Sequence, residues 1–267
     1  MKSSVTLCDV AEAAAGPFVF HGPLAGGFAK AAEHGFDAVE LFLPGPDAYS
    51  ASEILDLAGC HQVAIAAVGT GAGMVKHGLT LTDPSATIRE EALDFVKRMI
   101  DLGGQLGAPA IVGSMQGKST DGVSRDQALD WLAAAMLDAA ATAGNHGVPL
   151  LYEPLNRYET NLINRQADAL AFLDIRNIAN CRILADLFHM NIEERDPAAA
   201  LRAIAPRLGH VHFADSNREA VGHGHTDPAP ILAVLRDIPY LGYLSAEILP
   251  LPDAATAARD FLHSIQS

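Results

Sequence analysis

The sequence predicts an α/β protein, a (β/α)8 TIM barrel, and three observations support this fold class. Short apolar runs alternate with longer helical patterns, and eight such runs occur in 267 residues. That length suits one barrel, which typically takes about 250 residues. Carboxylate and imidazole side chains close four consecutive runs, as expected where parallel strands converge at one end of a barrel. We therefore expect residues 1–267 to form a single domain.

Eight apolar runs have the length and composition of buried β-strands. They cover residues 5–10, 36–43, 63–70, 109–114, 148–153, 181–186, 208–213 and 240–247. Strands that alternate with helices in this way form parallel βαβ units, and eight units favour a closed barrel over an open sheet. The first run is not followed by a GxGxxG motif, so a dinucleotide-binding fold has no support.

The segments between the runs carry helical patterns with recognisable starts. The clearest covers about residues 85–106, where Asp83 is the expected N-cap and Pro84 the first helical residue. A second, rich in Ala and Leu, is expected from about residue 125 to 146. Further starts are expected at Asp196-Pro197, Asp227-Pro228 and Pro252-Asp253. Three long loops, at residues 69–83, 113–121 and 154–165, would rim the active site of a barrel.

Charge and composition exclude several classes of protein. The net charge of −14 argues against a nucleic-acid surface, because phosphate binding needs a basic patch. It also disfavours attraction to an anionic membrane. We expect neither a membrane span nor a signal peptide, since no apolar run approaches about 18 residues. Three widely spaced cysteines, Cys8, Cys60 and Cys181, form no CxxC pair and indicate reduced thiols in a cytoplasmic protein.

Four residues at the ends of consecutive runs form the candidate metal site. They are Glu153, Asp186, His212 and Glu247, separated by 33, 26 and 35 residues, each close to one strand-plus-helix unit. A single residue of this kind is more often a helix N-cap or a surface charge, but four at successive strand ends are much harder to explain in that way. An oxygen-rich set with one imidazole suits Mn²⁺, Mg²⁺ or Co²⁺ better than a thiolate-type zinc site.

These residues permit proton transfer beside a ketone. A divalent ion can polarise a carbonyl and a neighbouring hydroxyl of a sugar, which lowers the pKa of the C–H bond between them. Glu153 and Glu247, on opposite faces, could then act in turn as base and acid. Transfer across one carbon gives an epimer, whereas transfer between neighbouring carbons interconverts aldose and ketose. The residues alone leave both outcomes open.

Three further polar residues lie close to the ligands in the sequence and are expected to bind substrate oxygens. His189 follows the second ligand by three residues, Arg218 follows the third by six, and Glu159 follows the first by six. Each also has a structural interpretation, as a helix-start histidine, a rim ion pair and a solvated loop charge respectively. His223 and His225, in VGHGHTDP, are expected to belong to a rim loop rather than to bind further metal ions.

The segments that carry these residues resemble the xylose isomerase-like TIM-barrel superfamily, and within it the D-tagatose 3-epimerase and 5-keto-L-gluconate epimerase branch. They are EPLNRYETNLIN (153–164), ADLFHMNIEE (185–194), HVHFADSNR (210–218), GHGHTD (222–227) and SAEI (245–248). VELFL (39–43) and GTGAGMVKHGLTLTDP (69–84) are also similar to that branch. The resemblance therefore covers nearly the whole chain.

The resemblance implies an isomerase that inverts the carbon next to the ketone of a ketose or keto-sugar acid. The four ligands would bind one divalent ion, usually Mn²⁺, and Glu153 and Glu247 would pass a proton across a cis-enediolate. Glu159, His189 and Arg218 would hold substrate oxygens near the reacting carbons. The resemblance also implies a homodimer or homotetramer.

Three positions depart from that branch. Leu187 stands where Thr is usual, and Leu249 stands where some ketose epimerases carry an aromatic residue that shapes the pocket. The loop GSMQGK (113–118) replaces a more aliphatic or Arg-bearing stretch. These departures bear on which sugar is bound more than on the chemistry.

Other functions fit the sequence less well. An aldose–ketose isomerase, including one for hydroxypyruvate-type substrates, is the alternative on the same metal site. An abasic-site endonuclease would need a trinuclear zinc site with histidines on the second and third strands, where VELFL and VAIAAVGT have none. A non-catalytic sugar-binding barrel would not need both glutamates. Lys118, Arg125, Arg157 and Arg218 could each bind a substrate carboxylate, so the charge of the sugar stays open.

Overall fold

The strands form a closed parallel barrel. The computed structural model describes residues 1–266, and within them the strand order is β2-β1-β3-β4-β5-β6-β7-β8-β9, with β1 also paired to β9. The strands are β1 (Lys2–Cys8), β2 (Phe20–His21), β3 (Ala38–Phe42), β4 (Ala64–Gly69), β5 (Ala110–Val112), β6 (Leu150–Tyr152), β7 (Cys181–Asp186), β8 (Leu208–His212) and β9 (Tyr243–Ala246). Because β1 pairs with both β3 and β9, eight strands close the ring and the predicted fold is confirmed.

Each of the eight predicted runs overlaps one barrel strand, and the run at residues 181–186 coincides with β7. Nothing in the sequence predicts β2. It has only two residues, which pair with Leu7 and Cys8 of β1. A two-residue strand is too short to show the alternation of apolar and polar residues that identifies longer strands.

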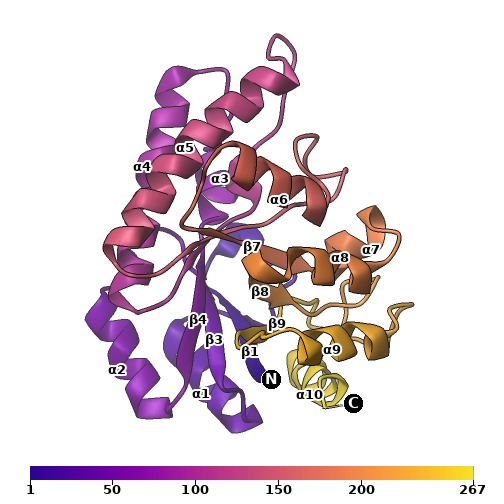
Figure 1. Ribbon diagram of the computed structural model, residues 1–267. Coiled ribbons are helices and arrows are strands. Elements are labelled where there is room, and N and C mark those ends of the chain that lie inside the picture. The colour runs from indigo at the N-terminus through magenta and orange to yellow at the C-terminus, as the bar shows by residue number, and fades with distance from the viewer. Residues whose placement is uncertain (267) are drawn as a thin grey trace.

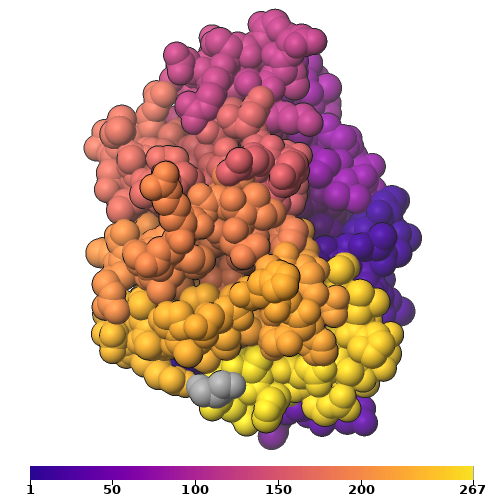
Figure 2. Space-filling view, turned by 90° about the vertical axis from the view of Figure 1, so that its right-hand side faces the viewer, coloured from indigo at the N-terminus to yellow at the C-terminus, as the bar shows by residue number. Residues whose placement is uncertain are grey.

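The helices form a layer outside the strands (Figure 1). They are α1 (Leu24–His34), α2 (Ala51–His61), α3 (Ala72–His77), α4 (Ala86–Gln105), α5 (Arg125–Asn145), α6 (Gln166–Ile175), α7 (Leu187–Glu193), α8 (Pro197–Ile204), α9 (Pro228–Asp237) and α10 (Ala254–Ser264). Figure 2 shows successive segments of the chain lying in consecutive bands down one side of the molecule, as expected for repeated βα units. None of the described helices has both the length and the apolar composition to cross a membrane.

The predicted helix starts are correct except at α4. Asp196, Asp227 and Asp253 cap α8, α9 and α10 through their side chains, as expected. At α4, however, the N-cap is Ser85, and Pro84 lies before the helix. The Asp83 carboxylate instead accepts a hydrogen bond from the Ser85 backbone N–H at 2.8 Å. An aspartate that bonds two residues ahead turns the chain locally, so the helix begins two residues later than predicted.

The interior of the barrel and the strand register set the position of the site. Ala67, Ile111, Leu151 and Leu184, one from each of β4 to β7, form a small buried cluster separate from the main core. In barrels of this kind such side chains fill the interior. The register pairs Asp186 of β7 with His212 of β8, and His212 with Ser245 of β9. Polar side chains therefore gather at the carboxyl ends of these strands.

Two neighbouring glycines of α1 provide a test of how closely that helix packs on β1. A Cβ atom at Gly27 would lie 2.3 Å from Leu7 Cδ2, whereas one at Gly26 would meet nothing within 4 Å. Gly27→Ala should lower the free energy of unfolding by about 1–3 kcal/mol, because the core there would be overpacked. Gly26→Ala should raise it by about 0.5–1 kcal/mol, because alanine favours the helix. Urea unfolding measures both, and equal effects would contradict the packing described here.

Candidate active site

Four side chains meet where β6, β7, β8 and β9 end. Glu153 directly follows β6, Asp186 and His212 are the last residues of β7 and β8, and Glu247 directly follows β9. One potential ligand atom of each residue lies within 4.8 Å of those of the other three. The first three are buried, and Glu247 is partly buried. The structure thus brings together the four residues that the sequence analysis selected as metal ligands.

Buried polar atoms that face the centre of this cluster have no hydrogen-bond partner among the described residues. His212 Nδ1 lies 3.5 Å from Glu153 Oε1, 3.5 Å from Asp186 Oδ2 and 3.4 Å from Glu247 Oε2. Neither His212 Nδ1 nor Asp186 Oδ2 has a hydrogen-bond partner among the described residues. Buried polar atoms without partners are costly, and three carboxylates around one imidazole suit a hard divalent cation. The residues therefore fit a divalent metal ion.

Burial and mutual charge shift the pKa values of these groups. Burial raises the pKa of Glu153, and the nearby Glu247 adds to this, although His212 opposes it. Burial would also raise the pKa of Asp186, but His189, His212 and Arg218 outweigh it and hold that pKa well below its usual value. For His212, burial disfavours the charged ring, yet Glu40 and Glu247 raise the pKa well above its ordinary value. In the absence of metal, a protonated imidazole thus supplies positive charge.

Glycine at position 113 leaves room for one of the glutamates. A Cβ atom at Gly113, just after β5, would lie 2.3 Å from Glu153 Oε2. The carbonyl oxygen of Glu153 accepts a hydrogen bond from Gln116 Nε2 at 3.0 Å, and Gln116 Oε1 accepts one from Tyr152 Oη at 2.8 Å. These buried contacts fix the strand end that carries Glu153. The loop after β5 therefore helps to set the position of this carboxylate.

Glu40 belongs to the candidate site, and the sequence analysis missed it. It lies in β3, is 4% exposed, and accepts hydrogen bonds from His210 Nε2 at 2.8 Å and Ser245 Oγ at 2.8 Å. His212 Nε2 lies 3.1 Å from Glu40 Oε1. The only sign of Glu40 in the sequence is that a charged residue stands inside the apolar run VELFL. That signal is weak alone, because the two histidines it meets are about 170 residues away.

The contact with Glu40 sets the orientation of the His212 ring. Burial alone would raise the pKa of Glu40, but the charges of His212 and His210 and the hydrogen bonds they donate hold it well below its usual value. An ionised carboxylate only accepts, so His212 Nε2 carries the hydrogen and Nδ1 faces the other three ligands. Partners of this kind fix the tautomer of metal-binding histidines. Glu40, His210 and His212 are also close enough to hold an ion, but the ring nitrogens that face Glu40, His210 Nε2 and His212 Nε2, are already hydrogen-bonded to it.

His189 borders the cluster from α7. The ring is 1% exposed, and its Nδ1 atom accepts a hydrogen bond from Asn156 Nδ2 at 2.8 Å. Its Nε2 atom has no hydrogen-bond partner among the described residues and lies 3.8 Å from Glu153 Oε1 and 3.6 Å from Asp186 Oδ2. His189 therefore presents an N–H group to whatever occupies the cluster.

Arg218 and Glu159 face each other at the rim. Arg218 Nη2 lies 2.7 Å from Glu247 Oε2, and Nη1 lies 3.8 Å from Glu159 Oε1. The guanidinium also lies 4.7 Å from the centre of the Phe188 ring. Burial disfavours its charge, but Glu247 and Asp186 outweigh this and raise the pKa of Arg218. Glu159 accepts a second contact from Asn156 Nδ2, and its side chain is 40% exposed, so it can reach a ligand at the mouth.

A single buried aspartate folds the loop that carries Arg218. Asp215 accepts hydrogen bonds from the backbone N–H groups of Ser216, Gly222, Gly224 and Thr226, which together hold its pKa at about 2 against the effect of burial. Arg218 itself has φ of 63°, a left-handed conformation that is uncommon outside glycine. Such conformations persist only where the surrounding structure enforces them. The rim loop is therefore built to hold Arg218 in place.

The two histidines of this loop lie apart from the four-ligand cluster. His223 Nε2 contacts Asp260 Oδ2 at 3.1 Å, and His225 is exposed. Neither belongs to the groups of potential ligands found within residues 1–266. Both lie in the loop that carries Arg218.

The cluster opens into a cavity of about 330 Å³. Apolar side chains near the ends of β1, β3 and β4 line part of this cavity, and the rest of the lining includes Glu153, Glu159, His189, His212, Arg218 and Glu247.

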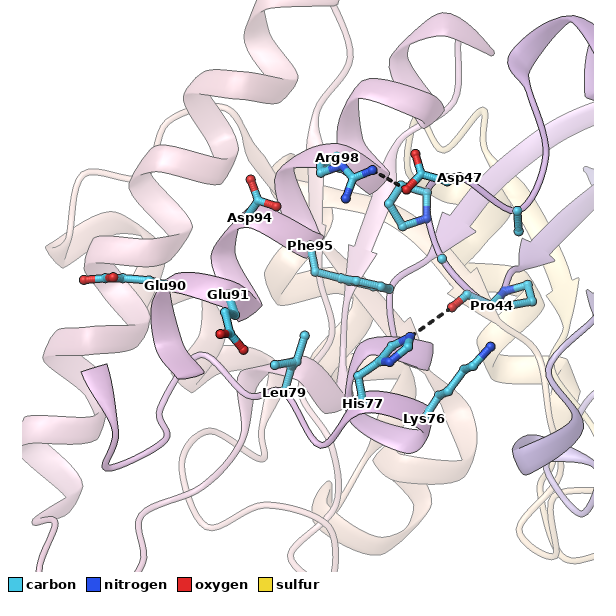
Figure 3. A pocket seen from close by; sticks show the side chains of 13 residues that line it. Pro44, Asp47, Lys76, His77, Leu79, Glu90, Glu91, Asp94, Phe95 and Arg98 are labelled. Carbon is cyan, nitrogen blue, oxygen red and sulfur yellow. Dashed lines mark hydrogen bonds and ion pairs between the residues drawn. The ribbon is translucent and has the colours of Figure 1, made fainter. Parts of the chain in front are cut away.

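A larger hollow of about 910 Å³ lies elsewhere, bordered by α3, by α4 and by the segment that follows β3 (Figure 3). There Arg98 contacts Asp47, and His77 contacts the Pro44 carbonyl oxygen. Those charged groups are largely exposed and do not converge on one point, so this hollow is a poorer candidate for catalysis.

Replacement of Glu40 tests its role in orienting His212. In Glu40→Gln, the amide keeps the size of the side chain but offers only one acceptor oxygen to the three donors, which are His210, His212 and Ser245. Affinity for Mn²⁺, measured by calorimetry, should fall about 10–100-fold, the usual effect of losing a partner of a metal ligand. Glu53→Gln, an exposed substitution at the start of α2, is the matched control. Unchanged affinity in Glu40→Gln would contradict the role.

Relatives of known activity resemble large parts of the chain. The L-ribulose 3-epimerase of Methylomonas sp. (strain DH-1) is 33% identical over 223 residues, which cover 82% of this chain and 76% of that protein. The 3-dehydro-D-guloside 4-epimerase of Escherichia coli (strain K12) is 39% identical over 121 residues, covering 45% of this chain and 46% of the other.

Solved structures and a family model agree with these relatives. The crystal structure of a D-allulose 3-epimerase from Methylomonas sp. in complex with D-allulose has a TM-score of 0.83 and 27% identity, covering 100% of this chain and 97% of that one. The family model for the xylose isomerase-like TIM barrel matches residues 28–265. The chain therefore belongs to the xylose isomerase-like TIM barrel family.

Proposed function

We propose that this protein is a metal-dependent epimerase that inverts the carbon next to the ketone of a ketose or keto-sugar acid. The observation that carries the proposal is the set of three carboxylates around the free Nδ1 atom of His212. The epimerase activities of its relatives support the same reaction class. Proton transfer at a carbon beside a ketone needs groups on both sides of that carbon, and the cluster offers two glutamates.

The proposed site holds one divalent ion, Mn²⁺ in our proposal, and Mg²⁺ or Co²⁺ would also fit; its ligands would be Glu153, Asp186, His212 and Glu247. When bound, this ion supplies a positive charge that polarises the ketone and a neighbouring hydroxyl of the sugar. His212 would give up the Nδ1 proton that it holds in the absence of metal, because an imidazole nitrogen that binds a metal must be free of its proton.

The two glutamates then move the proton. One of Glu153 and Glu247 removes it from the carbon beside the ketone, which gives a cis-enediolate of the sugar. The other returns a proton to the opposite face, and the configuration inverts. Burial raises the pKa of Glu153, which makes its carboxylate a stronger base toward the C–H bond of the sugar.

The three rim residues would bind the sugar. His189 Nε2–H is directed at the cluster and can donate to a substrate oxygen, and Arg218 can stabilise negative charge that develops there. Glu159 can accept a hydrogen bond from a hydroxyl farther from the reacting carbon. We also include a homodimer or homotetramer in the proposal, which light scattering would test.

A turnover panel in D₂O tests the reaction. Metal-stripped and Mn²⁺-loaded protein would be given D-tagatose, D-fructose, D-psicose, ribulose, 5-keto-gluconate and tagaturonate, and the products separated by chromatography. Metal-dependent inversion at the carbon next to the ketone, which is C3 in the ketoses, with one deuterium incorporated is the expected result. Formation of an aldose instead would establish the alternative, an aldose–ketose isomerase. A strong preference for the two acids would identify the substrate as a keto-sugar acid.

Single glutamate variants should separate the two halves of proton transfer. Glu153→Gln and Glu247→Gln should each lower kcat for epimerisation roughly 10²–10⁴-fold. Because one carboxylate remains in each variant, each should still exchange the C3 proton of one epimer with D₂O. The epimer that exchanges should differ between the two variants. Proton exchange is read by NMR, with Glu91→Gln on α4 as the control. Full epimerisation by either variant would contradict the two-glutamate mechanism.

Metal affinity should depend on pH because of the raised pKa values of His212 and Glu153. A raised pKa means that a group keeps its proton to a higher pH than usual, and any such proton must leave when the ion binds. Apparent affinity for Mn²⁺ should therefore rise with pH between 6 and 8, by up to about tenfold per unit for each proton released. Calorimetry in two buffers of different ionisation enthalpy counts the protons. Constant affinity with no proton release would show that these groups are already deprotonated.

A further inference from the structure

A second cavity joins the candidate active site and extends away from the metal ligands. It has a volume of about 270 Å³ and shares Met74, Ser114, Leu155 and Glu159 with the first cavity. The rest of its lining comes from the segment between α3 and α4 and from the loop after β5, namely Thr80, Thr82, Asp83, Pro84, Gly117, Lys118 and Thr120. Together the two cavities fall in the size range of sites that hold a ligand larger than one small sugar.

Hydrogen bonds between loops build the second cavity. The Leu81 backbone N–H donates to the Met115 carbonyl oxygen at 2.8 Å, and Thr82 Oγ1 donates to the Gln116 carbonyl oxygen at 3.0 Å. Thr160 Oγ1 donates to the Gly117 carbonyl oxygen at 2.8 Å. Three loops are thus joined, and the cavity between them is preformed rather than a gap between independent segments.

The lining is suited to a sugar ring. Met74, Pro84 and Leu155 provide apolar surface, while Thr80 and Thr120 carry hydroxyl groups that form no hydrogen bonds within the described part of the chain. Apolar surface with a few free polar groups is typical of sites that bind small organic ligands. At about 30 Å³ per water, the cavity has room for on the order of nine waters, enough for one further sugar unit.

Charge determines which kind of ligand fits. The second cavity is bordered by two carboxylates, Asp83 and Glu159, and by one ammonium group, that of Lys118. No ion pair of Lys118 is found in residues 1–266, so it is available to a ligand. A phosphate or carboxylate placed here would meet more negative than positive charge, whereas a neutral hydroxyl-rich group can donate to both carboxylates and accept from Lys118. The lining favours a neutral ligand.

We propose that the second cavity is a subsite for a neutral sugar unit, so that the substrate is a keto-sugar carrying a second, glycosidically linked sugar. This rests on the proposed epimerase function. The ketone end would lie among Glu153, His212 and Glu247, and Glu159 would contact the sugar near the junction of the two cavities. Contacts remote from the reacting carbon can raise kcat/KM because their binding energy helps to position the reacting end.

Two disaccharides that contain a ketose test this proposal against a free ketose. Lactulose carries galactose on O4 of fructose, isomaltulose carries glucose on O6, and D-fructose carries neither. The proposal expects kcat/KM for at least one disaccharide to exceed that for D-fructose at least tenfold. Thr120→Trp, which places a large ring in the second cavity, should reduce this preference at least tenfold. Asp121→Trp, the neighbouring exposed position outside both cavities, is the matched control and should retain the preference.

A binding measurement separates failure of the subsite from failure of the epimerase function. Calorimetry with Mn²⁺-loaded Glu153→Gln should show tighter binding of a disaccharide than of D-fructose, and this difference should disappear in Glu153→Gln/Thr120→Trp. Turnover of D-fructose with no preference for either disaccharide would overturn the subsite alone. Disaccharide binding that Thr120→Trp weakens, without turnover of any sugar, would support the subsite and contradict the epimerase function.

Discussion

The concentration of negative charge at one end of the barrel is the constraint on which the rest of the site depends. Glu40, Glu153, Asp186 and Glu247 all lie near His212, which sits between them as the last residue of β8. Arg218 neutralises part of this charge through Glu247. Such a group of buried carboxylates is stable only if positive charge accompanies it, either as protons or as a bound cation. The stability of the candidate site therefore depends on how this negative charge is balanced.

The surrounding structure keeps this arrangement from collapsing. Glu40 holds one nitrogen of His212, so that the other faces the cluster, and Gly113 leaves the space that Glu153 occupies. Asp215 folds the rim loop that presents Arg218. These contacts come from four different strands, β3, β5, β6 and β8, or from the loops that follow them, which explains why a closed barrel, rather than any single motif, is needed to form the site.

The fold and the grouping of the four candidate ligands could be predicted from the sequence, because each follows from alternation along the chain or from its place after a strand. The sequence was not sufficient for Glu40, whose partners His210 and Ser245 lie at least 170 residues away. It also placed the start of α4 too early, since the Asp83 side chain bonds in a turn rather than at the helix cap. The second cavity could not be predicted either, because it depends on bonds between loops such as Thr82 to Gln116.

The most direct test of the account is anomalous X-ray scattering from a crystal of the protein grown with Mn²⁺. One strong peak should lie among the ligand atoms of Glu153, Asp186, His212 and Glu247, with His212 bound through Nδ1 and Glu40 still bonded to Nε2. A peak between Glu40, His210 and His212 instead, or no peak in this end of the barrel at saturating Mn²⁺, would contradict the central claim that this cluster is built around a divalent ion.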